Sequence, residues 1–494
     1  MWSPSQDRLD RANLSRFMRF VREEVGNADL NSYAVLYRYS IDQPAAFWTL
    51  LWDFVGIRGS GERMPVLLND DGMALARWFP GVSLNFAQNL LRFDDDRIAI
   101  RSHGSADEHE DITYGQLQRR VAVLAAAMRS AGVVPGDRIA ALLPNIPDTL
   151  VAMLASACVG ATWFACPSHL AQDDALAAMQ SVEPALIYTT PENLPLAARL
   201  ASGRIVVVGP TGDLEDFVTP FEAADIEFET LPFDHPLYLT CTTVNGGMRE
   251  LLMHGAGGTL IQHLKELVLH VDLRREDKVF FHAGTDTMAW YWLASSLATG
   301  ATLVLHSGDE LPTDGAALWD LLDEYGISVL GVHSQWLDAA AGSGLKPMES
   351  HRLLALKTIL TAGARLSPEA YDFVYRDVKE RVLLAPISTG GDTLACFALG
   401  APVLPVYRGE IPCRGLAMRV EVLDAEHRAL VGEVGDLCCT APFPSMPIGF
   451  FDDTNKLRYD AAYFSRHPGA WSRGDRATLT TRESLALSEE GHRG

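Results

Sequence analysis

The chain has 494 residues, and its 48% hydrophobic and 21% charged residues match an ordinary globular protein. A chain of this length is too long to fold around one simple hydrophobic core, so we expect a large domain with an appendage. The 41 basic and 63 acidic residues give a formal net charge of −22, which argues against nucleic acid and membrane partners because both surfaces are themselves negative.

The sequence carries no pattern of a targeting segment or a metal cluster. Its first residues contain no apolar core of a signal peptide, and no run approaches the roughly 18 apolar residues of a membrane span. The seven cysteines are scattered without a CxxC pair, so neither a disulfide framework nor a zinc cluster is predicted. We expect a cytoplasmic protein without a bound metal.

Short apolar strands alternate with helices along most of the chain. Helical spacing of apolar residues appears first in Asn13–Val25 and Pro44–Phe54. The strands predicted after them include Arg97–Arg101, Arg138–Leu143, Ala161–Ala165, Ala185–Tyr188, Ile205–Val208, Lys278–Phe281, Ala301–Leu305, Ser328–Gly331, Thr358–Leu360 and Val382–Leu384. Such strands are typical of parallel sheets covered on both faces, so the sequence predicts an α/β fold. From Val403 onward the pattern changes to short strands separated by turns.

The stretch Thr240–Gly258 follows the apolar strand Pro236–Thr240 and precedes a helical pattern that begins near Thr259. A strand, a loop rich in glycine and hydroxyl groups, and a helix predict a phosphate-binding loop, because loop amides and a helix N-terminus donate to anions. The loop carries Glu250 where such loops normally contain lysine. A rebuilt anion site and a relaxed surface loop are both consistent with this pattern.

Sequence blocks from Trp2 to about Thr480 resemble the acyl-adenylating (AMP-forming, ANL) ligases, closest to their acetoacetyl-CoA synthetase branch. The blocks include Trp2-Ser-Pro-Ser5, Ala76-Arg-Trp-Phe-Pro-Gly81, Leu404-Pro-Val-Tyr-Arg-Gly-Glu410, Pro442-Phe-Pro-Ser-Met-Pro447 and Trp471-Ser-Arg-Gly-Asp475. The resemblance implies a large N-terminal domain of two βαβ-layered subdomains plus a β-barrel, with an adenylate where they meet. It divides the chain into an N-terminal helical extension (1–75), two α/β subdomains (76–402), and a β-barrel subdomain with a truncated tail (403–494).

The resemblance also implies a reaction and a set of nucleotide-binding residues. Such ligases join a carboxylate to AMP with release of pyrophosphate, then pass the acyl group to a thiol. The residues at matching positions are Thr242, Thr243, Asn245, Gly246 and Gly247 in the phosphate loop, Gly363 and Ala364 beside adenine, Thr389, Gly390, Gly391 and Asp392 near the phosphate and adenine, and Asp475 on the ribose hydroxyls. Structural alternatives remain, because Gly390-Gly391 can form a tight turn that Asp392 caps, and Asp475 can be a solvated turn residue.

An acyl pocket is implied by a second group of matching positions. The candidate lining residues are Thr287, Trp290, Val332, Ser334 and Arg365. His282 and His333 are candidate acid–base or carbonyl-orienting residues, since histidine titrates near neutrality, although each can also be a core histidine. Thr287 replaces the leading tryptophan of an aromatic wall in this branch, which favours a substrate larger than acetoacetate. Arg365 replaces a proline and can meet a phosphate or a carboxylate, or lie on the surface.

The main functional hypothesis rests on three family residues that have no counterpart in the sequence: the loop lysine, a hinge arginine and a lysine of the small mobile C-terminal domain. That domain is expected to be absent. Each residue typically stabilises the transition state by roughly 3 kcal/mol. We therefore expect a diverged enzyme that binds acyl-AMP, an acyl thioester or a carrier-bound acyl group. It would perform acyl transfer, condensation or cyclisation without efficient adenylation of its own.

Two alternatives to this hypothesis remain. One is an AMP-forming carboxylic acid–CoA ligase that acts with a separate C-terminal domain, and the other is a non-catalytic scaffold. The expected ligands are AMP or an adenylate, or acyl-CoA, while the loop argues against ATP and Mg²⁺ binding. The expected partners are a small-molecule acyl substrate and either an acyl carrier protein or a separate ligase partner.

Overall fold

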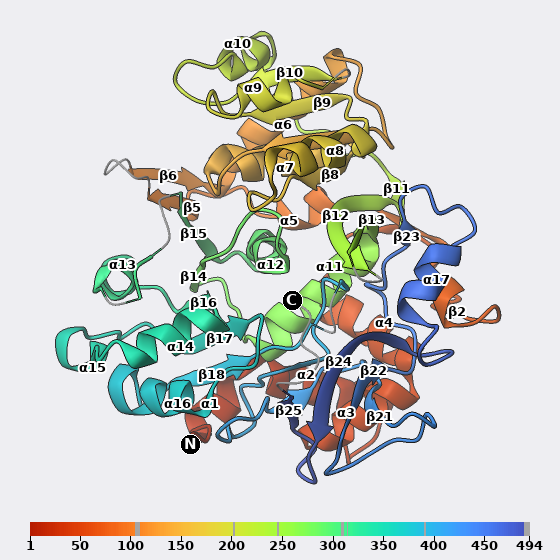
Figure 1. The fold of residues 1–494 in the computed structure, drawn as a ribbon, viewed down its shortest axis with the longest axis vertical. Helices are drawn as coiled ribbons and strands as arrows, with labels where there is room; N and C mark the ends of the chain where they lie inside the picture. The colour runs from red at the N-terminus through yellow and green to blue at the C-terminus, as the bar shows by residue number, and fades with distance from the viewer. Residues whose placement is uncertain are drawn as a thin grey trace.

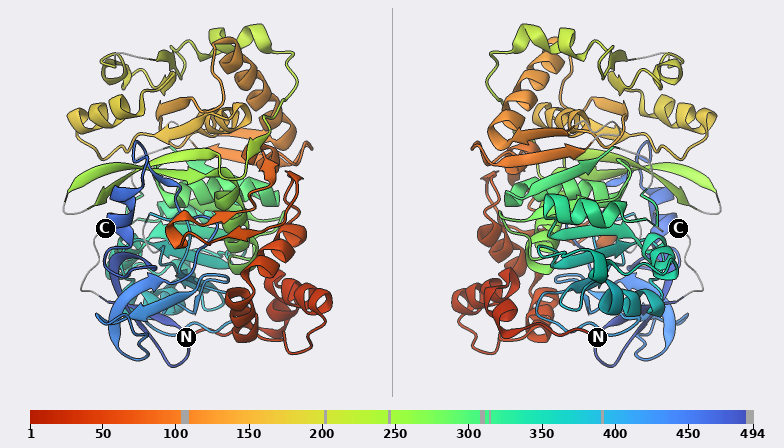
Figure 2. Two further views of the ribbon diagram at one scale, coloured as in Figure 1. Left: turned by 90° about the vertical axis from the view of Figure 1, so that its right-hand side faces the viewer. Right: turned by 90° about the vertical axis from the view of Figure 1, so that its left-hand side faces the viewer.

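The computed structural model describes residues 1–103, 109–200, 203–244, 247–307, 311–313, 315–389 and 392–488. These residues form two large α/β layers and a smaller antiparallel sheet near the C-terminal end (Figure 1). The first α/β layer lies at the top of the view, and the second lies below it beside the N-terminal helices, an arrangement that the side views in Figure 2 repeat. The α/β class predicted from the sequence is confirmed.

The first large sheet combines a parallel part with an antiparallel edge. In sheet order its strands are β10 (Arg204–Val207), β9 (Leu186–Thr189), β7 (Arg138–Leu142), β8 (Thr162–Ala165), β12 (Pro236–Val244), β13 (Met248–Gly255) and β23 (Gly449–Phe450). The helices of this region are α5 (Phe86–Leu90), α6 (Tyr114–Ser130), α7 (Pro147–Val159), α8 (Gln172–Val182), α9 (Leu194–Ala197) and α10 (Leu214–Val218). Strands β10 to β12 pair in parallel, whereas β13 is antiparallel to both of its neighbours. Strands β8 and β9 are buried at every position, as expected for parallel strands covered on both faces.

The second large sheet is parallel except at one edge. In sheet order its strands are β18 (Leu383–Pro386), β17 (Thr358–Ala362), β16 (Val329–His333), β14 (Lys278–Phe281), β15 (Thr302–His306), β5 (Ile98–His103) and β6 (His109–Thr113). Its helices are α11 (Ala256–Leu264), α12 (Met288–Ser295), α13 (Ala317–Tyr325), α14 (Ser334–Gly342), α15 (Pro347–Ser350) and α16 (Pro368–Phe373). Helix α11 continues as a π-helical segment, Lys265–His270, in which the side chains are almost entirely buried. No helix within the described residues is both long and apolar enough to cross a membrane.

The C-terminal region forms an antiparallel sheet where a β-barrel was expected. Its strands are β21 (Val420–Leu423), β22 (Val434–Cys439), β24 (Trp471–Leu479) and β25 (Leu485–Leu487), and α17 (Leu457–Tyr463) precedes β24. Smaller ladders are formed by β1 (Ser60–Gly61), β4 (Val82–Leu84) and β11 (Leu231–Pro232), by β2 (Leu67–Leu68) and β3 (Arg77–Trp78), and by β19 (Ala398–Leu399) and β20 (Cys413–Arg414). Phe443, Tyr459, Tyr463 and Trp471 belong to a hydrophobic cluster beneath the C-terminal sheet.

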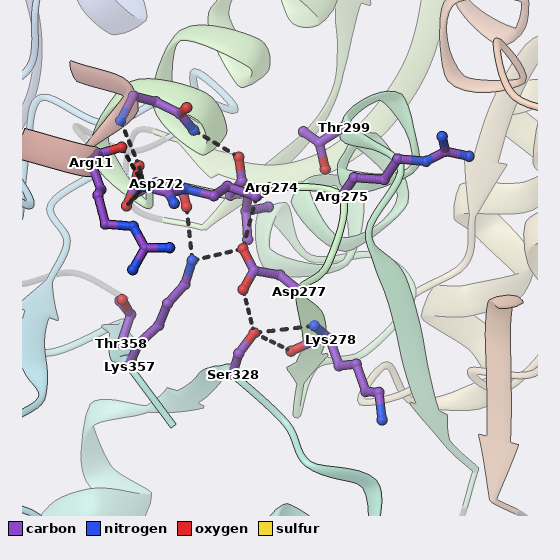
Figure 3. Close-up of polar contacts among 12 residues, drawn as sticks. Arg11, Asp272, Arg274, Arg275, Asp277, Lys278, Thr299, Ser328, Lys357 and Thr358 are labelled. Carbon is purple, nitrogen blue, oxygen red and sulfur yellow. Dashed lines mark hydrogen bonds and ion pairs between the residues drawn. The ribbon is translucent and has the colours of Figure 1, made fainter. Parts of the chain in front are cut away.

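The N-terminal helices dock against the second layer through a polar network. They are α1 (Gln6–Arg11), α2 (Asn13–Val25), α3 (Tyr33–Asp42) and α4 (Pro44–Val55). The first amide of α2, on Asn13, donates to Asp272 Oδ1 at 2.7 Å, and the Asn13 side chain donates to the Leu273 carbonyl at 2.9 Å. Arg274 donates to the Arg11 carbonyl at 2.5 Å and pairs with Asp272 (Figure 3). These bonds satisfy the start of α2, which has no side-chain cap of its own.

An ion pair between the partly buried Lys357 and the buried Asp277 lies at the centre of this network. Lys357 Nζ contacts Asp277 Oδ2 at 2.7 Å and donates to the Asp272 carbonyl at 2.9 Å. The Asp277 side chain is only 6% exposed, and it also accepts from the Ser328 hydroxyl and the Arg274 amide at 2.8 Å each (Figure 3). Lys357 and Ser328 lie at the amino ends of β17 and β16, so the pair connects the sheet edge to the loop that leads into β14.

Replacing Lys357 by methionine is expected to lower the unfolding free energy by about 3 kcal/mol. The substitution leaves the buried Asp277 carboxylate without its cation, and breaking a buried pair in this way costs far more than losing an exposed one. Urea denaturation of wild type and variant measures the effect. Lys346→Met is the matched control, because Lys346 and Glu349 form an exposed pair and their loss should cost less than about 1 kcal/mol. Equal losses in the two variants would contradict the prediction.

The predicted phosphate loop has a different backbone from the one expected. Thr240–Gly258 is mostly a β-hairpin, in which β12 pairs with β13 and Thr242 lies opposite Glu250. Helix α11 then begins at Ala256 rather than near Thr259. The expectation of a strand, a long loop and a helix is therefore wrong. The apolar run Leu251–Met253 forms a strand inside the sheet, and the glycine and hydroxyl residues around it obscured this strand in the sequence.

Candidate functional site

An apolar cavity of about 360 Å³ lies at the carboxyl ends of β14, β16 and β17. Ligands of open parallel sheets bind at this edge. The lining residues are 281–284, 287–289, 292, 331–333, 360–363, 387 and 389. Six residues predicted from the sequence are among them: His282, His333, Thr287, Val332, Gly363 and Thr389.

His333 lies at the rim of this cavity against a glycine. It is the last residue of β16, it is exposed, and it pairs with Ala362 on β17. Gly363 has φ +96°, and a Cβ on it would lie 2.2 Å from His333 Nε2, so only glycine permits this ring position. His282 follows β14 directly, is half-buried, and its backbone amide donates to the Gly331 carbonyl at 2.9 Å. His333 is therefore not a core histidine.

Two predicted lining residues face away from the cavity. Trp290 is fully buried and its indole N–H donates to Asn145 Oδ1 at 3.0 Å. Trp292 lines the cavity instead, because it lies three residues after Ala289 and therefore on the same face of α12. The Ser334 hydroxyl donates to the Ala362 carbonyl at 3.0 Å, where it joins the start of α14 to β17. The expectation that Trp290 and Ser334 line the pocket is corrected accordingly.

Ala364 and Arg365 follow the turn at Gly363 and are both half-buried. Neither belongs to the lining of the cavity. The predicted contact of Arg365 with a substrate carboxylate therefore has no support from the pocket geometry.

Asp392 joins three distant segments beside this cavity. Its Oδ2 accepts from the Thr242 hydroxyl of the hairpin and from the Tyr463 hydroxyl of α17, at 2.8 Å each. Its Oδ1 pairs with the guanidinium of Arg473 on β24. The Asp392 side chain is 11% exposed, and its backbone has φ +47°. Thr389, which lines the cavity, lies three residues earlier, so the cavity and this cluster are adjacent along the chain.

Tyr463 is held as a hydrogen-bond donor within the cluster. Burial, together with the neighbouring Asp392 carboxylate, raises the pKa of Tyr463 well above its ordinary value, so the phenol keeps its proton. Its ring stacks on Trp471 with centroids 4.0 Å apart and planes at 11°. Helix α17 and the beginning of β24 are therefore packed together beside Asp392.

Asp475 lies on a bulge of β24. The pairing register of β22 and β24 shifts between Asp436 and Cys438, and Gly474 within the bulge has φ +97°. Bulges of this kind redirect side chains next to functional sites. Asp475 is half-buried and two residues from Arg473, so the predicted ribose-binding residue lies in the segment that reaches the Asp392 cluster.

Glu250 does not face a phosphate as an unpaired carboxylate. It pairs with Arg458 Nε of α17 at 3.0 Å, and its side chain is 9% exposed. Its neighbour Arg249 pairs with Asp174 at the start of α8, at 2.9 Å. The repulsion expected between Glu250 and a triphosphate is therefore largely cancelled within the protein.

The remaining predicted loop residues divide between described and undescribed positions. Thr243 is exposed and its carbonyl accepts from Arg473 at 3.4 Å. Gly247 has φ +130° at the hairpin tip. Asn245, Gly246, Gly390 and Gly391 lie outside the described residues.

Sequence reasoning missed three residues of this site: Trp292, Tyr463 and Arg473. The helical spacing from Ala289 could have identified Trp292. Arg473 was quoted in a family block, but only its neighbour Asp475 was assigned a role. Tyr463 carries no sequence signal, because its partner Asp392 is separated from it by 71 residues.

Known proteins resemble this chain over nearly its whole length. A family model described as AMP-binding enzyme matches residues 86–446. The acetoacetyl-CoA synthetase of Xenopus tropicalis is 37% identical over 96% of this chain and 75% of its own, and that of Rhizobium meliloti is 35% identical over 99% and 78%. The solved structure of acetoacetyl-CoA synthetase from Streptomyces lividans superposes with a TM-score of 0.91 at 32% identity, covering 98% of this chain and 79% of its own.

These relatives overturn the main functional hypothesis from the sequence. The hypothesis of a diverged enzyme that transfers acyl groups without efficient adenylation is wrong, because relatives of 35–37% identity over almost the whole chain are named as CoA synthetases. The relatives favour the alternative of an AMP-forming carboxylic acid–CoA ligase. They give no support to the expectation that the protein fails to bind ATP and Mg²⁺. With a family model matched over most of its length and relatives of this similarity, the chain belongs to the AMP-binding (acyl-adenylating, ANL) enzyme family.

Proposed function

We propose that the protein is an AMP-forming carboxylate–CoA ligase that acts on acetoacetate or on a larger β-keto acid, since Thr287 in the cavity wall leaves room for one. One observation carries this proposal beyond the family assignment. Among the residues that line the cavity of about 360 Å³, His282 and His333 are the only titratable side chains in an otherwise mainly apolar surface. Such a cavity suits a short acyl chain with polar oxygens, because apolar walls hold the chain and two imidazoles bond to the oxygens.

The proposed reaction has two steps. A carboxylate oxygen of the acid attacks the α-phosphorus of MgATP, the bond from that phosphorus to its bridging oxygen breaks, and pyrophosphate leaves. The sulfur of CoA then attacks the acyl carbonyl carbon, and AMP leaves with the bonding electron pair. ATP with its Mg²⁺ and CoA are thus proposed as substrates.

Residues of this chain would position the two substrates of the first step. We assign the acid to the cavity, with Thr287 and Val332 in its wall and His282 and His333 as donors to its oxygens. Gly363 and Ala364 are proposed for the adenine side. Asp475 is proposed for the ribose hydroxyls, because one carboxylate can accept from both.

Two finer assignments remain part of the proposal. We propose that the end of the hairpin with Thr242 and Gly247 is a phosphate loop whose residues differ from those usual in the family. We also propose the division of the chain into 1–75, 76–402 and 403–494. In this division the acid binds within 76–402, and the nucleotide binds where 76–402 meets 403–494.

Pyrophosphate release tests this function. Protein, MgATP and CoA are mixed with acetoacetate, and a panel of straight-chain and β-keto acids is compared in parallel. Because the relatives are longer than the matched region, the chain is assayed alone and with the unmatched part of one relative added as a separate polypeptide. Acid-dependent pyrophosphate release in either mixture supports the proposal, and silence with every acid in both mixtures rejects it.

Removing either imidazole is expected to lower kcat/KM for the acid on the order of 10-fold, the cost of one hydrogen bond to a charged or polar oxygen. His282→Ala and His333→Ala are measured separately at saturating ATP. His351→Ala is the control, since His351 pairs with Asp320 outside the cavity. Unchanged kcat/KM in both pocket variants would remove the histidines from substrate binding.

A further inference from the structure

We propose that Arg473 supplies, at the nucleotide phosphates, the positive charge that a loop lysine supplies in the family. The inference rests on the proposed ligase function and assigns a specific residue to its ATP site. In the hairpin β12–β13, Glu250 stands at the position of that lysine, opposite Thr242.

The lysine position itself cannot provide a cation. Glu250 is paired with Arg458, and its side chain is 9% exposed. Arg249, the neighbouring basic residue, faces the opposite side of the hairpin and pairs with Asp174. A positive charge for the phosphates therefore has to come from another element.

Arg473 comes from β24 to the side of the hairpin that carries Thr242. Its guanidinium pairs with Asp392, which also accepts from the Thr242 hydroxyl, and it donates to the Thr243 carbonyl at 3.4 Å. Thr243 is the second-last residue of β12, so the guanidinium lies beside the strand end that leads into the hairpin tip. Asp392 and the Thr243 carbonyl thus fix the position of the cation.

Arg473 keeps donors for a ligand. A guanidinium carries five N–H groups, and within the described residues its contacts are the Asp392 carboxylate and the Thr243 carbonyl. Its side chain is 21% exposed, so it is not sealed inside the protein. Arginine suits this role because its planar fork can donate two parallel bonds to phosphate oxygens.

The carboxylate partner does not prevent this role. Asp392 Oδ2 accepts two hydroxyl donors, from Thr242 and Tyr463, so its negative charge is shared between those hydrogen bonds and the ion pair. A triphosphate carries several negative charges, and a partly compensated arginine still attracts it. AMP carries fewer charges and is expected to depend less on Arg473.

Calorimetry with ATP and with AMP tests the inference. Arg473→Ala is expected to weaken ATP binding about 10- to 100-fold and AMP binding less than about threefold, as for the loss of a charge-assisted hydrogen bond. Arg473→Lys should recover part of the ATP affinity, because lysine keeps the charge but not the fork. Arg482→Ala is the control, since Arg482 pairs with Glu410 away from the hairpin and its loss should leave ATP binding unchanged.

The outcomes separate this inference from the ligase proposal. A wild-type protein that releases pyrophosphate, with an Arg473→Ala variant that binds ATP as tightly as wild type, overturns the role of Arg473 alone. Equal weakening for ATP and AMP also overturns it, because it would indicate a general loss of the fold of the site. A wild-type protein that binds ATP through Arg473 but is silent with every acid leaves the inference standing and rejects the ligase function.

Discussion

Lowering the pH from 7 to 4.5 is expected to reduce the unfolding free energy by roughly 7 kcal/mol. The reason is a group of three buried histidines, His254, His263 and His270, on β13, α11 and the π-helical segment that follows. Burial lowers the pKa of each of them to about 3. Between an ordinary pKa near 6.5 and this value, the unfolded chain binds protons that the folded chain excludes, so stability falls as the pH falls.

Hydrogen bonds show why these rings resist protonation. His270 Nε2 accepts from the Leu416 amide at 3.4 Å while its Nδ1 contacts the Gly400 carbonyl at 2.9 Å, which defines a neutral tautomer. His263 contacts the Ser295 hydroxyl and the Leu394 carbonyl at 2.8 Å each. A second proton on His270 would face an N–H donor. Each histidine contributes roughly 2.5 kcal/mol over this pH range, so the three together account for a large part of a typical total stability.

Urea titrations at pH 7, 6, 5 and 4.5 measure this loss. His263→Gln should make the dependence shallower by about 1.4 kcal/mol per pH unit, the effect of one proton, because glutamine can still donate and accept a hydrogen bond. His169→Gln is the matched control at an exposed histidine and should leave the slope unchanged. A stability that stays constant from pH 7 to pH 5 would show that the three rings do not control it.

Replacing Gly363 by alanine is expected to lower kcat/KM for the acid about 10-fold, as much as removing the His333 imidazole. The new methyl carbon would lie 2.2 Å from His333 Nε2, so the ring has to leave its position at the rim of the cavity. A displaced imidazole no longer donates to the substrate oxygen, so the expected loss is that of one hydrogen bond. Steady-state kinetics with varied acid at saturating ATP measures the change.

A backbone effect can be separated from the collision with His333. Gly344 has φ +80° but no atom within 4 Å of an added Cβ, so Gly344→Ala carries the strain of positive φ without a collision. This control should keep wild-type kcat/KM. Adding His333→Ala to Gly363→Ala should give a double variant no worse than His333→Ala alone. If the losses in kcat/KM of the two single variants add fully in the double variant, Gly363 acts independently of His333.

The sequence was most informative where periodicity and burial agree. The alternating strands and helices predicted both parallel sheets closely, and Asn13–Val25 and Lys278–Phe281 match the observed elements residue for residue. In these segments the spacing of apolar residues follows the period of the helix or strand, because one face packs against neighbouring elements. Helix α3 was expected only as part of the helical extension 1–75, and helix α17 was not predicted.

The candidate site was harder to predict because its contacts join distant segments. The family positions led to the residues around the cavity, but helix phase decided between Trp290 and Trp292. The charge at Glu250 depended on Arg458, more than 200 positions away in the chain, which no local pattern indicates. An ion-pair partner of this kind changes the charge that a motif presents, and the residues of the motif itself do not indicate that partner.

The Asp392 cluster has a consequence for the order in which this protein assembles. Thr242 and Asp392 are 150 residues apart, and β21, β22 and α17 lie between Asp392 and Arg473 in the chain, so the three side chains meet only after the hairpin and the C-terminal sheet have both packed into place. A nucleotide that needs all three binds the fully folded chain and no earlier state. Saturating ATP should therefore raise the melting temperature of the whole protein, and thermal shift with ATP becomes a measure of completed folding.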